Sequence, residues 1–256
     1  MKGGTDQYSY VQNSSLQRRG IDLSQVMINE AIAKDINVEN QLMNNPNTIF
    51  RVVDLGCSVG SNSLVNDIIE AIDLKIKSYF QGLEPMQCIT SEFHVYFNDK
   101  TSNDFNTLFA LIPLKKRYFA AGVPGSFHGR LFPRASLYIV NSSTALHWLS
   151  RVPKEVGDIN SSAWNKGKIH YNNASNEVLQ AYSAQYVMDM EAFLLARGHE
   201  IIRGGLMFIL VPPMGDGTLV SQTGLGLQAD VLGSCFMEMA KMVTFMYSKS
   251  HYCNGQ

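Results

Sequence analysis

The chain has little of what several classes of site and partner require. Its four cysteines form no C-x-x-C pair, whereas a structural zinc site needs clustered ligands. The formal net charge is -1, so the chain lacks the basic excess of a surface that binds nucleic acid or an anionic membrane. The longest apolar run, residues 205–213, is too short to span a bilayer. These absences predict a protein without nucleic-acid or membrane partners.

Residues 1–6 are polar and hold no apolar stretch of the kind that forms a secretory signal. Reduced thiols and a cytoplasmic location are therefore expected. The thiols concerned are Cys57, Cys88, Cys235 and Cys253. Of the 256 residues, 45% are hydrophobic and 17% are charged, which is enough apolar material for a sizeable core. We expect one domain over residues 1–256, with no internal repeat or linker.

The chain is organised around residues 51–62, RVVDLGCSVGSN. The apolar residues of 52–55 predict a buried parallel strand, the small residues of 56–60 a turn, and the apolar spacing of 64–72 a helix. This order is the first unit of a nucleotide-binding α/β sheet, whose ligands lie outside the carboxyl ends of the strands. The turn is neither G-x-G-x-x-G nor a P-loop. An ordinary tight strand-to-helix turn is the alternative for this stretch taken alone.

A second strand is expected over residues 92–97 and ends in Asn98 and Asp99. An acidic side chain at this place holds a ribose in such folds, because its two oxygens can accept from both sugar hydroxyls. The separation from the glycine turn is longer than in a compact unit, which a long first helix and loop would explain. A surface or N-cap aspartate is the alternative role of Asp99.

The rest of the pattern alternates between helices and strands. Helices are expected at 23–32, 103–109, 175–197 and 231–246, and strands at 118–122, 136–141 and 204–211. Residues 215–226 indicate a glycine-rich loop, and residues 247–256 show no periodicity. The order predicts a mostly parallel sheet with helices on both faces. Residues 144–150 follow a strand and are therefore expected near the ligand.

Eight motifs occur in a fixed order along the chain. They are MKGG at 1–4, SYVQNS at 9–14, DLGCS at 54–58, FND at 97–99, NDFNTLF at 103–109, GVPGSF at 122–127, HWLS at 147–150 and WNKG at 164–167. Together they resemble the plant SABATH family of S-adenosylmethionine-dependent methyltransferases. The resemblance implies a Rossmann-like methyltransferase sheet flanked by helices. It also implies S-adenosylmethionine as cofactor and a small acid, such as salicylate, jasmonate, benzoate or farnesoate, as the substrate that is methylated on its carboxyl group.

The resemblance also assigns roles to single residues. Positions that hold S-adenosylmethionine or its demethylated product are matched by Tyr10, Ser14, Cys57, Asn62, Asp99, Lys100, Ser126 and Phe127. Positions that hold the substrate are matched by Gln17, Thr144, His147 and Trp148, and Lys2 matches a lysine near the carboxylate in salicylate-type members. In this scheme Asp99 takes the ribose and Phe127 packs on the adenine. Asn165 matches one member of a proposed metal-binding set, so magnesium is a second candidate cofactor, and family analogy implies a homodimer.

The chemistry of this reaction explains why the sequence has no obvious general base. Methyl transfer from a sulfonium is an in-line displacement, and a carboxylic acid with a pKa of about 4 is already ionised at neutral pH. No general base is required, so the lack of a Ser/His/Asp set or of paired carboxylates is expected. The Gln17 amide and the Trp148 indole N–H are donors that can orient a carboxylate. A packed aromatic pair is the alternative role of His147 and Trp148.

Four positions depart from the family pattern. Lys100 stands where an apolar residue usually lies beside the adenine, and its aliphatic stem can still cover a ring face. Thr144 replaces the usual tyrosine beside the reacting methyl group, which predicts a larger pocket. Ser61 and Arg203 each replace a proline, and no large effect is expected from either.

The resemblance fades after Met242. We expect a cofactor- and substrate-contacting segment over residues 1–49, a core over about 50–246 and a divergent tail over 243–256. Family members continue with further strands and a helical cap, so an incomplete cap, an incomplete metal set and an exposed sheet edge are expected.

Two alternatives to a carboxyl methyltransferase stay open at this stage. The expected truncation and Thr144 favour a non-catalytic relative that binds the cofactor or pairs with a full-length methyltransferase. A xanthine-type N-methyltransferase is compatible with His147, although its substrate would bring no carboxylate.

Overall fold

A computed structural model describes residues 3–38, 41–42, 48–60, 62–80, 91–168, 170–211 and 222–253. Lys2, Ser61 and Cys88 lie outside these ranges. The chain forms two compact units: Met1–Ser150 with Asp189–Pro212, and Arg151–Met188 with Pro213–Gln256. The expectation of a single domain over the whole chain stays a prediction.

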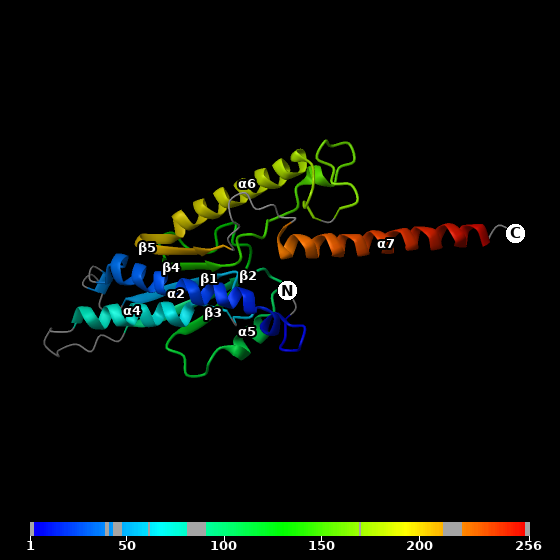
Figure 1. Ribbon diagram of the computed structural model, residues 1–256. Helices are drawn as coiled ribbons and strands as arrows, with labels where there is room; N and C mark the ends of the chain where they lie inside the picture. The colour runs from blue at the N-terminus through cyan, green and yellow to red at the C-terminus, as the bar shows by residue number, and fades with distance from the viewer. Residues whose placement is uncertain are drawn as a thin grey trace. The chain divides into compact units, whose positions relative to one another are not determined.

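The first unit holds the sheet and the helices that cover it (Figure 1). In chain order its elements are α1 (Tyr10–Asn13), α2 (Ser15–Asp35), β1 (Ile49–Leu55), α4 (Val65–Phe80), β2 (Glu92–Asp99), α5 (Phe105–Leu111), β3 (Phe119–Pro124), β4 (Leu137–Ser143) and β5 (Ile201–Leu210). Helix α6 (Asn176–Glu200) runs from the second unit into the first.

The five strands form one sheet in the order β3-β2-β1-β4-β5, and every neighbouring pair is parallel. The predicted parallel α/β sheet is thus confirmed. Strand β1 lies at its centre because its side chains are apolar on both faces, as a buried parallel strand requires. After β1 the chain continues to β2 and β3 on one side of the sheet, and after β4 it continues to β5 on the other side. A topological switch point therefore lies between β1 and β4.

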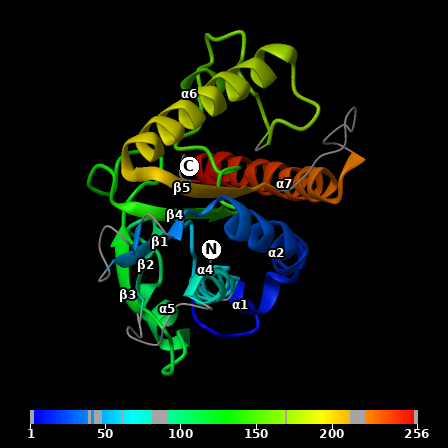
Figure 2. The same cartoon turned by 90° about the vertical axis from the view of Figure 1, so that its left-hand side faces the viewer.

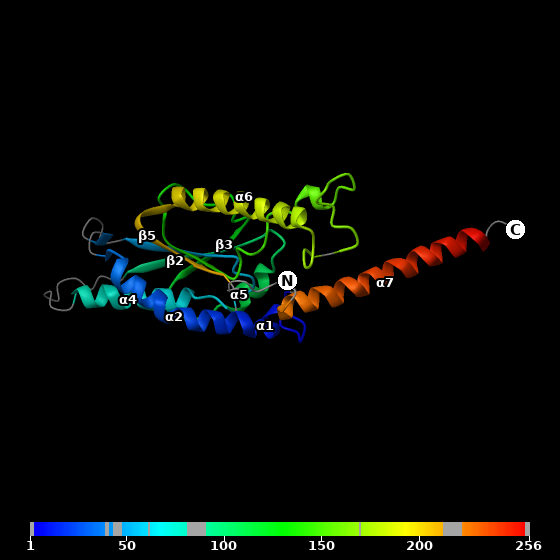
Figure 3. The same cartoon turned by 45° about the horizontal axis from the view of Figure 1, so that its top comes forward.

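The two faces of the sheet are covered by different helices (Figure 2). Phe50 and Val52 of β1 pack in one apolar cluster with isoleucines of α2 and α4. Helices α2 and α4 lie side by side on this face (Figure 3). Val53 and Leu55 point to the other face, where they pack with Phe193 of α6. This alternation is the two-residue period of a strand, and it fixes which side chains reach the carboxyl edge.

The second unit consists of η1 (Lys154–Val156), the first part of α6 and helix α7 (Gly224–Cys253). Helix α7 is longer than predicted, since both the end of the expected glycine-rich loop and residues 247–253 are helical. The Thr223 hydroxyl accepts from the backbone N–H of Gly226 at 3.1 Å, so the helix starts at an N-cap that the apolar pattern did not reveal. The Asn172 amide donates to the Gly226 carbonyl at 3.1 Å and to Asp230 at 2.7 Å, which ties this start to the unit.

Helix α2 also starts earlier than predicted, at Ser15 instead of residue 23. Its first turns are polar and largely exposed, and an Arg18–Asp22 pair at 3.1 Å lies on their surface, so no apolar period marked them. None of the helices in the described part of the chain combines the length and hydrophobicity of a membrane span.

Candidate functional site

Most predicted site residues of the first unit follow strands that end at one edge of the sheet. Leu55 at the end of β1 pairs with Asn98 of β2, and Asp99 at the end of β2 pairs with Pro124 of β3. Strand β4 ends at Ser143 on the other side of β1. The segments that carry Cys57, Lys100, Phe127 and Thr144 therefore begin together at the carboxyl edge, beside the switch point.

The turn after β1 requires its first glycine. Gly56 has a φ of +78°, and a Cβ atom there would clash with the Cβ of Ala145. The N–H groups of Gly56 and Cys57 both donate to the Asn98 carbonyl, at 2.8 and 3.0 Å. The turn is thus closed onto the end of β2, which brings the DLGCS motif and Asp99 together.

The Asp99 carboxylate is almost fully buried and partly committed to the backbone. One oxygen accepts from the Ser58 N–H at 2.8 Å, and the other accepts from the Lys100 N–H at 2.8 Å. Two ionised carboxylate oxygens offer about four acceptor positions, so each oxygen keeps capacity for a hydroxyl donor. The arrangement fits a group with two neighbouring hydroxyls, such as a ribose. The Lys100 side chain itself is exposed.

Phe127 lies across the turn from Asp99. Its ring is half-buried and makes an edge-on contact with Phe193, with ring centroids 6.3 Å apart. A Cβ on Gly56 would lie 3.7 Å from the Phe127 ring, so the glycine leaves the ring close to the backbone. An aromatic face beside a glycine turn can hold a planar base. The neighbouring Ser126 is exposed, and its hydroxyl accepts from the His128 N–H at 3.4 Å.

Three predicted cofactor residues from two distant stretches of the sequence meet just before the start of α4. The Asn62 amide donates to the Tyr10 hydroxyl and to the Ser14 carbonyl, both at 3.4 Å. Tyr10 belongs to α1, and Ser14 is the residue between α1 and α2. Gln17 lies half-buried on the first turn of α2. No hydrogen bond in the described part of the chain joins Gln17 to His147 or Trp148.

The segment after β4 carries the other predicted substrate residues. Thr144 has a φ of 53°, and its N–H donates to the Leu210 carbonyl at 2.7 Å. The rings of His147 and Trp148 are neighbours, with centroids 5.4 Å apart. Trp148 is 62% exposed, so its indole is open to a ligand. Desolvation by the surrounding protein lowers the pKa of His147, which keeps its imidazole neutral at pH 7.

Cys57 is buried and has no reactive thiolate. Burial raises the pKa of its thiol well above the ordinary value, and the negative charges of Asp54 and Asp99 add to that shift. The thiol therefore stays neutral and makes only a weak contact of 3.5 Å with the Ser58 carbonyl. Cys57 lies in the tight turn after β1.

Three polar side chains of this edge were missed as site residues. Asp54 accepts from the Asn141 amide at 2.8 Å, and burial raises the pKa of Asp54. Asn98 is fully buried, donates to the Val123 and Gly125 carbonyls, and keeps its own Oδ1 without a partner. The available signal was a polar residue at the end of an otherwise apolar strand, which marks the ligand edge of a parallel sheet.

The candidate metal residue Asn165 lies in the second unit. Its amide donates to the His170 carbonyl at 3.0 Å, and its N–H donates to the Val156 carbonyl at 3.1 Å. In the described part of the chain, no three His, Cys, Asp or Glu side chains gather in a way that would hold a metal ion. The described residues around Asn165 therefore do not fit a magnesium site, and we assign no step to a metal there.

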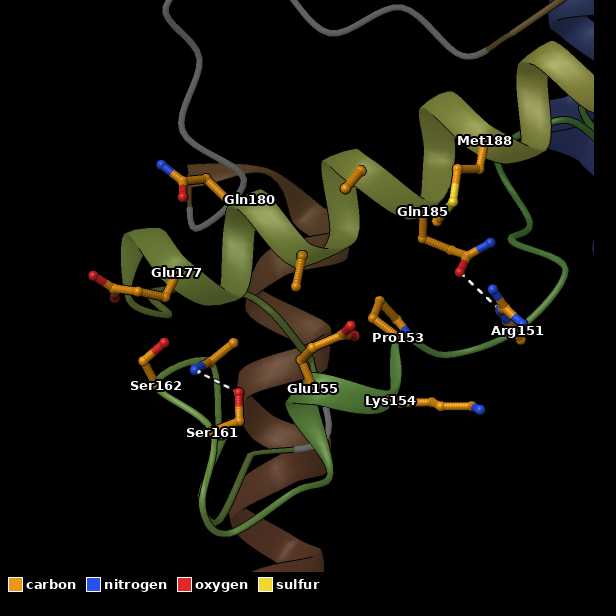
Figure 4. A pocket seen from close by; sticks show the side chains of 13 residues that line it. Arg151, Pro153, Lys154, Glu155, Ser161, Ser162, Glu177, Gln180, Gln185 and Met188 are labelled. Atoms are coloured by element: carbon orange, nitrogen blue, oxygen red, sulfur yellow. Dashed lines mark hydrogen bonds between the residues drawn. The ribbon is translucent and has the colours of Figure 1, made fainter.

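A hollow in the second unit lies between α6 and the segment that contains η1 (Figure 4). Gln185 of α6 accepts from the Arg151 guanidinium there, at 2.9 Å. The lining of the hollow combines Lys154 with Glu155 and Glu177, so the hollow favours neither a cationic nor an anionic ligand. None of the predicted site residues lines this hollow.

The sequence matches known proteins over nearly its whole length. The profile of the family described as SAM dependent carboxyl methyltransferase matches residues 1–251. Loganic acid O-methyltransferase of Catharanthus roseus is 46% identical over 242 residues, which are 93% of this chain and 63% of that relative. Farnesoic acid carboxyl-O-methyltransferase of Arabidopsis thaliana is 39% identical over 246 residues, which are 94% of this chain and 66% of that relative.

A solved structure gives the same relationship in three dimensions. It is a loganic acid methyltransferase with SAH, which matches with a TM-score of 0.83 at 44% identity, over 94% of this chain and 67% of that chain. This chain spans 63% of the length of the Catharanthus roseus relative. The resemblance inferred from the eight motifs is confirmed, and the chain belongs to the family of S-adenosylmethionine-dependent carboxyl methyltransferases.

Proposed function

We propose that this protein transfers a methyl group from S-adenosylmethionine to the carboxylate of a small organic acid and so forms a methyl ester. The observation that carries the proposal is the edge of the sheet at which the described cofactor residues of this family meet. The Asn62 amide joins Tyr10 and Ser14, while Asp99 and Phe127 flank the turn after β1.

The residues at this edge fit the parts of the cofactor. The free acceptor positions of Asp99 would take the two ribose hydroxyls, and the Phe127 ring would pack on the adenine. The unpartnered Oδ1 of the buried Asn98 is a further acceptor at the same edge. When bound, the cofactor supplies an electrophilic methyl group on a sulfonium.

The protein's part in the reaction is to orient the acid. A carboxylate is ionised at neutral pH, so no side chain has to remove a proton. The neutral His147 and the exposed indole of Trp148 offer N–H donors and a flat wall after β4, and Gln17 offers an amide. Holding the carboxylate oxygen in line with the methyl group is a gain in proximity and orientation.

The relatives support an acid as the acceptor. Their names specify loganic, farnesoic and gibberellic acids. These acids share a carboxyl group, so we propose a carboxylate acceptor in preference to a ring nitrogen. Which acid is accepted also depends on pocket walls, and Thr144 offers a smaller wall than the family's usual tyrosine.

A radiolabel assay tests the proposal. Purified chain is incubated with methyl-labelled S-adenosylmethionine and a panel of loganic, farnesoic, gibberellic and salicylic acids, and label is counted in the ester fraction. We expect transfer to at least one acid, and loss of that transfer in Asp99→Ala. Asp158→Asn, which alters an exposed turn of the second unit, serves as the matched control. A folded chain that binds SAH and methylates no acid would instead support the non-catalytic alternative.

Two further proposals rest on the sequence and on its family resemblance. We propose that the protein forms a homodimer, which light scattering after size-exclusion chromatography tests. We also propose a cytoplasmic location, which a fluorescent fusion imaged in leaf cells tests.

A further inference from the structure

The largest fully buried side chain in the described part of the chain is a charged one, Arg197 in the last turn of α6. Removing a guanidinium from water is costly, so every buried arginine needs partners for its donors. Burial lowers the pKa of Arg197, and the nearby Glu200 carboxylate opposes that shift. An arginine stays protonated in proteins, so the groups around Arg197 have to offset the cost of burying its charge.

Arg197 divides its donors between one carboxylate and two backbone carbonyls. Its Nε and Nη2 lie 2.8 and 2.7 Å from one oxygen of Glu200, which is also fully buried. Its Nη1 donates to the Phe127 carbonyl at 2.8 Å, and Nη2 donates to the Gly129 carbonyl at 2.9 Å. The guanidinium also lies 5.1 Å from the centre of the Phe193 ring, the same ring that contacts Phe127.

Glu200 holds the other end of the same loop. Its second oxygen accepts from the N–H groups of Leu131 and Phe132, at 2.5 and 2.9 Å. The pair thus makes four hydrogen bonds to the backbone of residues 127–132, from a point about seventy residues further along the chain. The amide of Asn98 holds the start of the loop through the Val123 and Gly125 carbonyls.

The loop held in this way carries the residue that would pack on the adenine. Because Phe127 is gripped through its own carbonyl, a shift of Arg197 would move the ring away from the turn after β1. A buried ion pair is often no more stabilising than apolar side chains of the same volume. The Arg197–Glu200 pair instead fixes the geometry of the loop, because a planar guanidinium can bind a carboxylate and two carbonyls in fixed directions.

We propose that Arg197 and Glu200 are positioning residues for cofactor binding, which fix residues 127–132 so that Phe127 receives the adenine. The inference rests on the proposed function, because it takes S-adenosylmethionine as the ligand of this edge. It adds a pair on α6 to the residues that the family resemblance assigned, and neither member of the pair needs to touch the cofactor.

Three variants separate positioning from stability. Arg197→Lys keeps the charge opposite Glu200 but loses the fork that reaches both carbonyls. Glu200→Gln keeps the shape but leaves Arg197 without its counter-ion. The double change of Arg197→Met with Glu200→Leu replaces the pair with apolar side chains, which restores a compatible core without restoring the loop contacts. Asp73→Asn, which weakens the ion pairs of Asp73 on α4 with Lys77 of the same helix and with Arg117 before β3, is the control.

Each variant is measured for the Kd of SAH by calorimetry, for thermal stability, and for hydrogen exchange at the Leu131 and Phe132 amides. We expect Arg197→Lys to raise the Kd of SAH by about tenfold, which corresponds to about 1.4 kcal/mol of binding free energy. Exchange at the two amides should rise in Glu200→Gln and in the double variant. The double variant should regain thermal stability but not SAH affinity, and Asp73→Asn should bind SAH as the wild type does.

Two results would overturn the proposal. One is wild-type SAH affinity in the double variant while its loop amides exchange faster, since the pair would then be structural only. The other is wild-type protein that is folded and binds no SAH, which would remove the proposed function together with its ligand. SAH binding by the wild type tests the proposed function, whereas SAH binding by the variants tests the positioning role. The failure of one proposal is therefore distinguishable from the failure of the other.

Discussion

Asp54 is a carboxylate placed inside the core at the end of β1. Burial raises its pKa above the ordinary value of 3.8, although Ser63 and Asn141 donate hydrogen bonds to it. A carboxyl group whose folded pKa is raised binds its proton more tightly in the native state. Its contribution to stability is therefore greatest at low pH and is lost as the pH rises from the unfolded value through the folded one.

The first prediction concerns Asp54→Asn, which keeps an acceptor for Asn141 and removes the buried charge. We expect the variant to be more stable than the wild type at pH 7 by about 1 kcal/mol, the usual size of a stabilising substitution. The difference should shrink as the pH falls from 7 through the raised pKa of Asp54 toward 3.8, because the carboxyl group of the wild type then becomes neutral too. Urea denaturation across this pH range measures it, with Asp158→Asn as an exposed control. A variant less stable at pH 7 would mean that the charge itself is required.

Thr144 is a β-branched residue in the left-handed region, which such residues rarely occupy. The N–H of Thr144 donates to Leu210, so the strand ladder holds the strained backbone in place. Thr144→Asn should raise the free energy of unfolding by about 1 kcal/mol, because asparagine accepts this conformation more readily. Thr101→Asn, in an exposed turn, should leave it unchanged. If both variants behave alike in chemical denaturation, the strain at Thr144 is absent.

Single residues also show what a sequence can and cannot reveal about a site. The position of Asp99 at the carboxyl edge was predictable because it ends a strand of the parallel sheet. Arg197 and Glu200 were not, since their partners on the loop lie 68 to 70 positions away and no periodicity links them. The family resemblance identified residues that contact ligands. It did not identify the residues that fix the loop on which Phe127 lies.

At the scale of elements, the strands were the easiest to predict. Strands β1 and β4 are apolar runs bounded by turns, because both of their faces are buried. Helix starts were harder, since α2 begins with exposed polar turns and α7 begins at a threonine cap inside a glycine-rich stretch. The apolar period reports the packed part of a helix, whereas its end depends on a cap.

Helix α5 has a cap that also holds the N-terminal segment. The Asp104 carboxylate accepts from the Thr107 N–H at 2.9 Å, from the Thr107 hydroxyl at 2.6 Å and from the Gly4 N–H at 3.0 Å. These bonds, those from Thr107 first, lower the pKa of Asp104. The contribution of this carboxylate to stability is therefore present at neutral pH and is lost as the pH falls below 3.8.

The third prediction separates the two roles of Asp104. Asp104→Ser still caps α5, but its shorter side chain does not reach Gly4, whereas Asp104→Ala loses both contacts. We expect both variants to be cut faster by protease within residues 4–9, and only the alanine variant to unfold at a lower temperature. Mass spectrometry of the digest and a thermal melt measure the two effects. Equal cleavage of all three proteins would show that Gly4 is held by something else.

At the scale of the whole molecule, the chain forms two compact units. The parallel sheet and its helices were predictable from the order of strands and helices. The division was not, because α6 is continuous through both units and no change of composition marks the boundary. Helix α7 carries exposed apolar side chains, such as Val231, which is 66% exposed, and Met242, which is 64% exposed. Exposed and buried apolar residues have the same spacing in a helix, so the sequence predicted the helix but not which of its side chains are buried.

The last prediction uses this division. The described cofactor residues, from Tyr10 and Ser14 to Asp99 and Phe127, all belong to the first unit. Saturating SAH should therefore slow hydrogen exchange in the first unit, at the α1–α2 junction, the turn after β1, the end of β2 and residues 125–132. Exchange in residues 151–188 and 222–253 should not change. At an SAH concentration of 100 times Kd, the added stability should be about 2.7 kcal/mol. Protection that appears instead in the second unit would show that the cofactor binds there, and the assignment of the sheet edge would then be wrong.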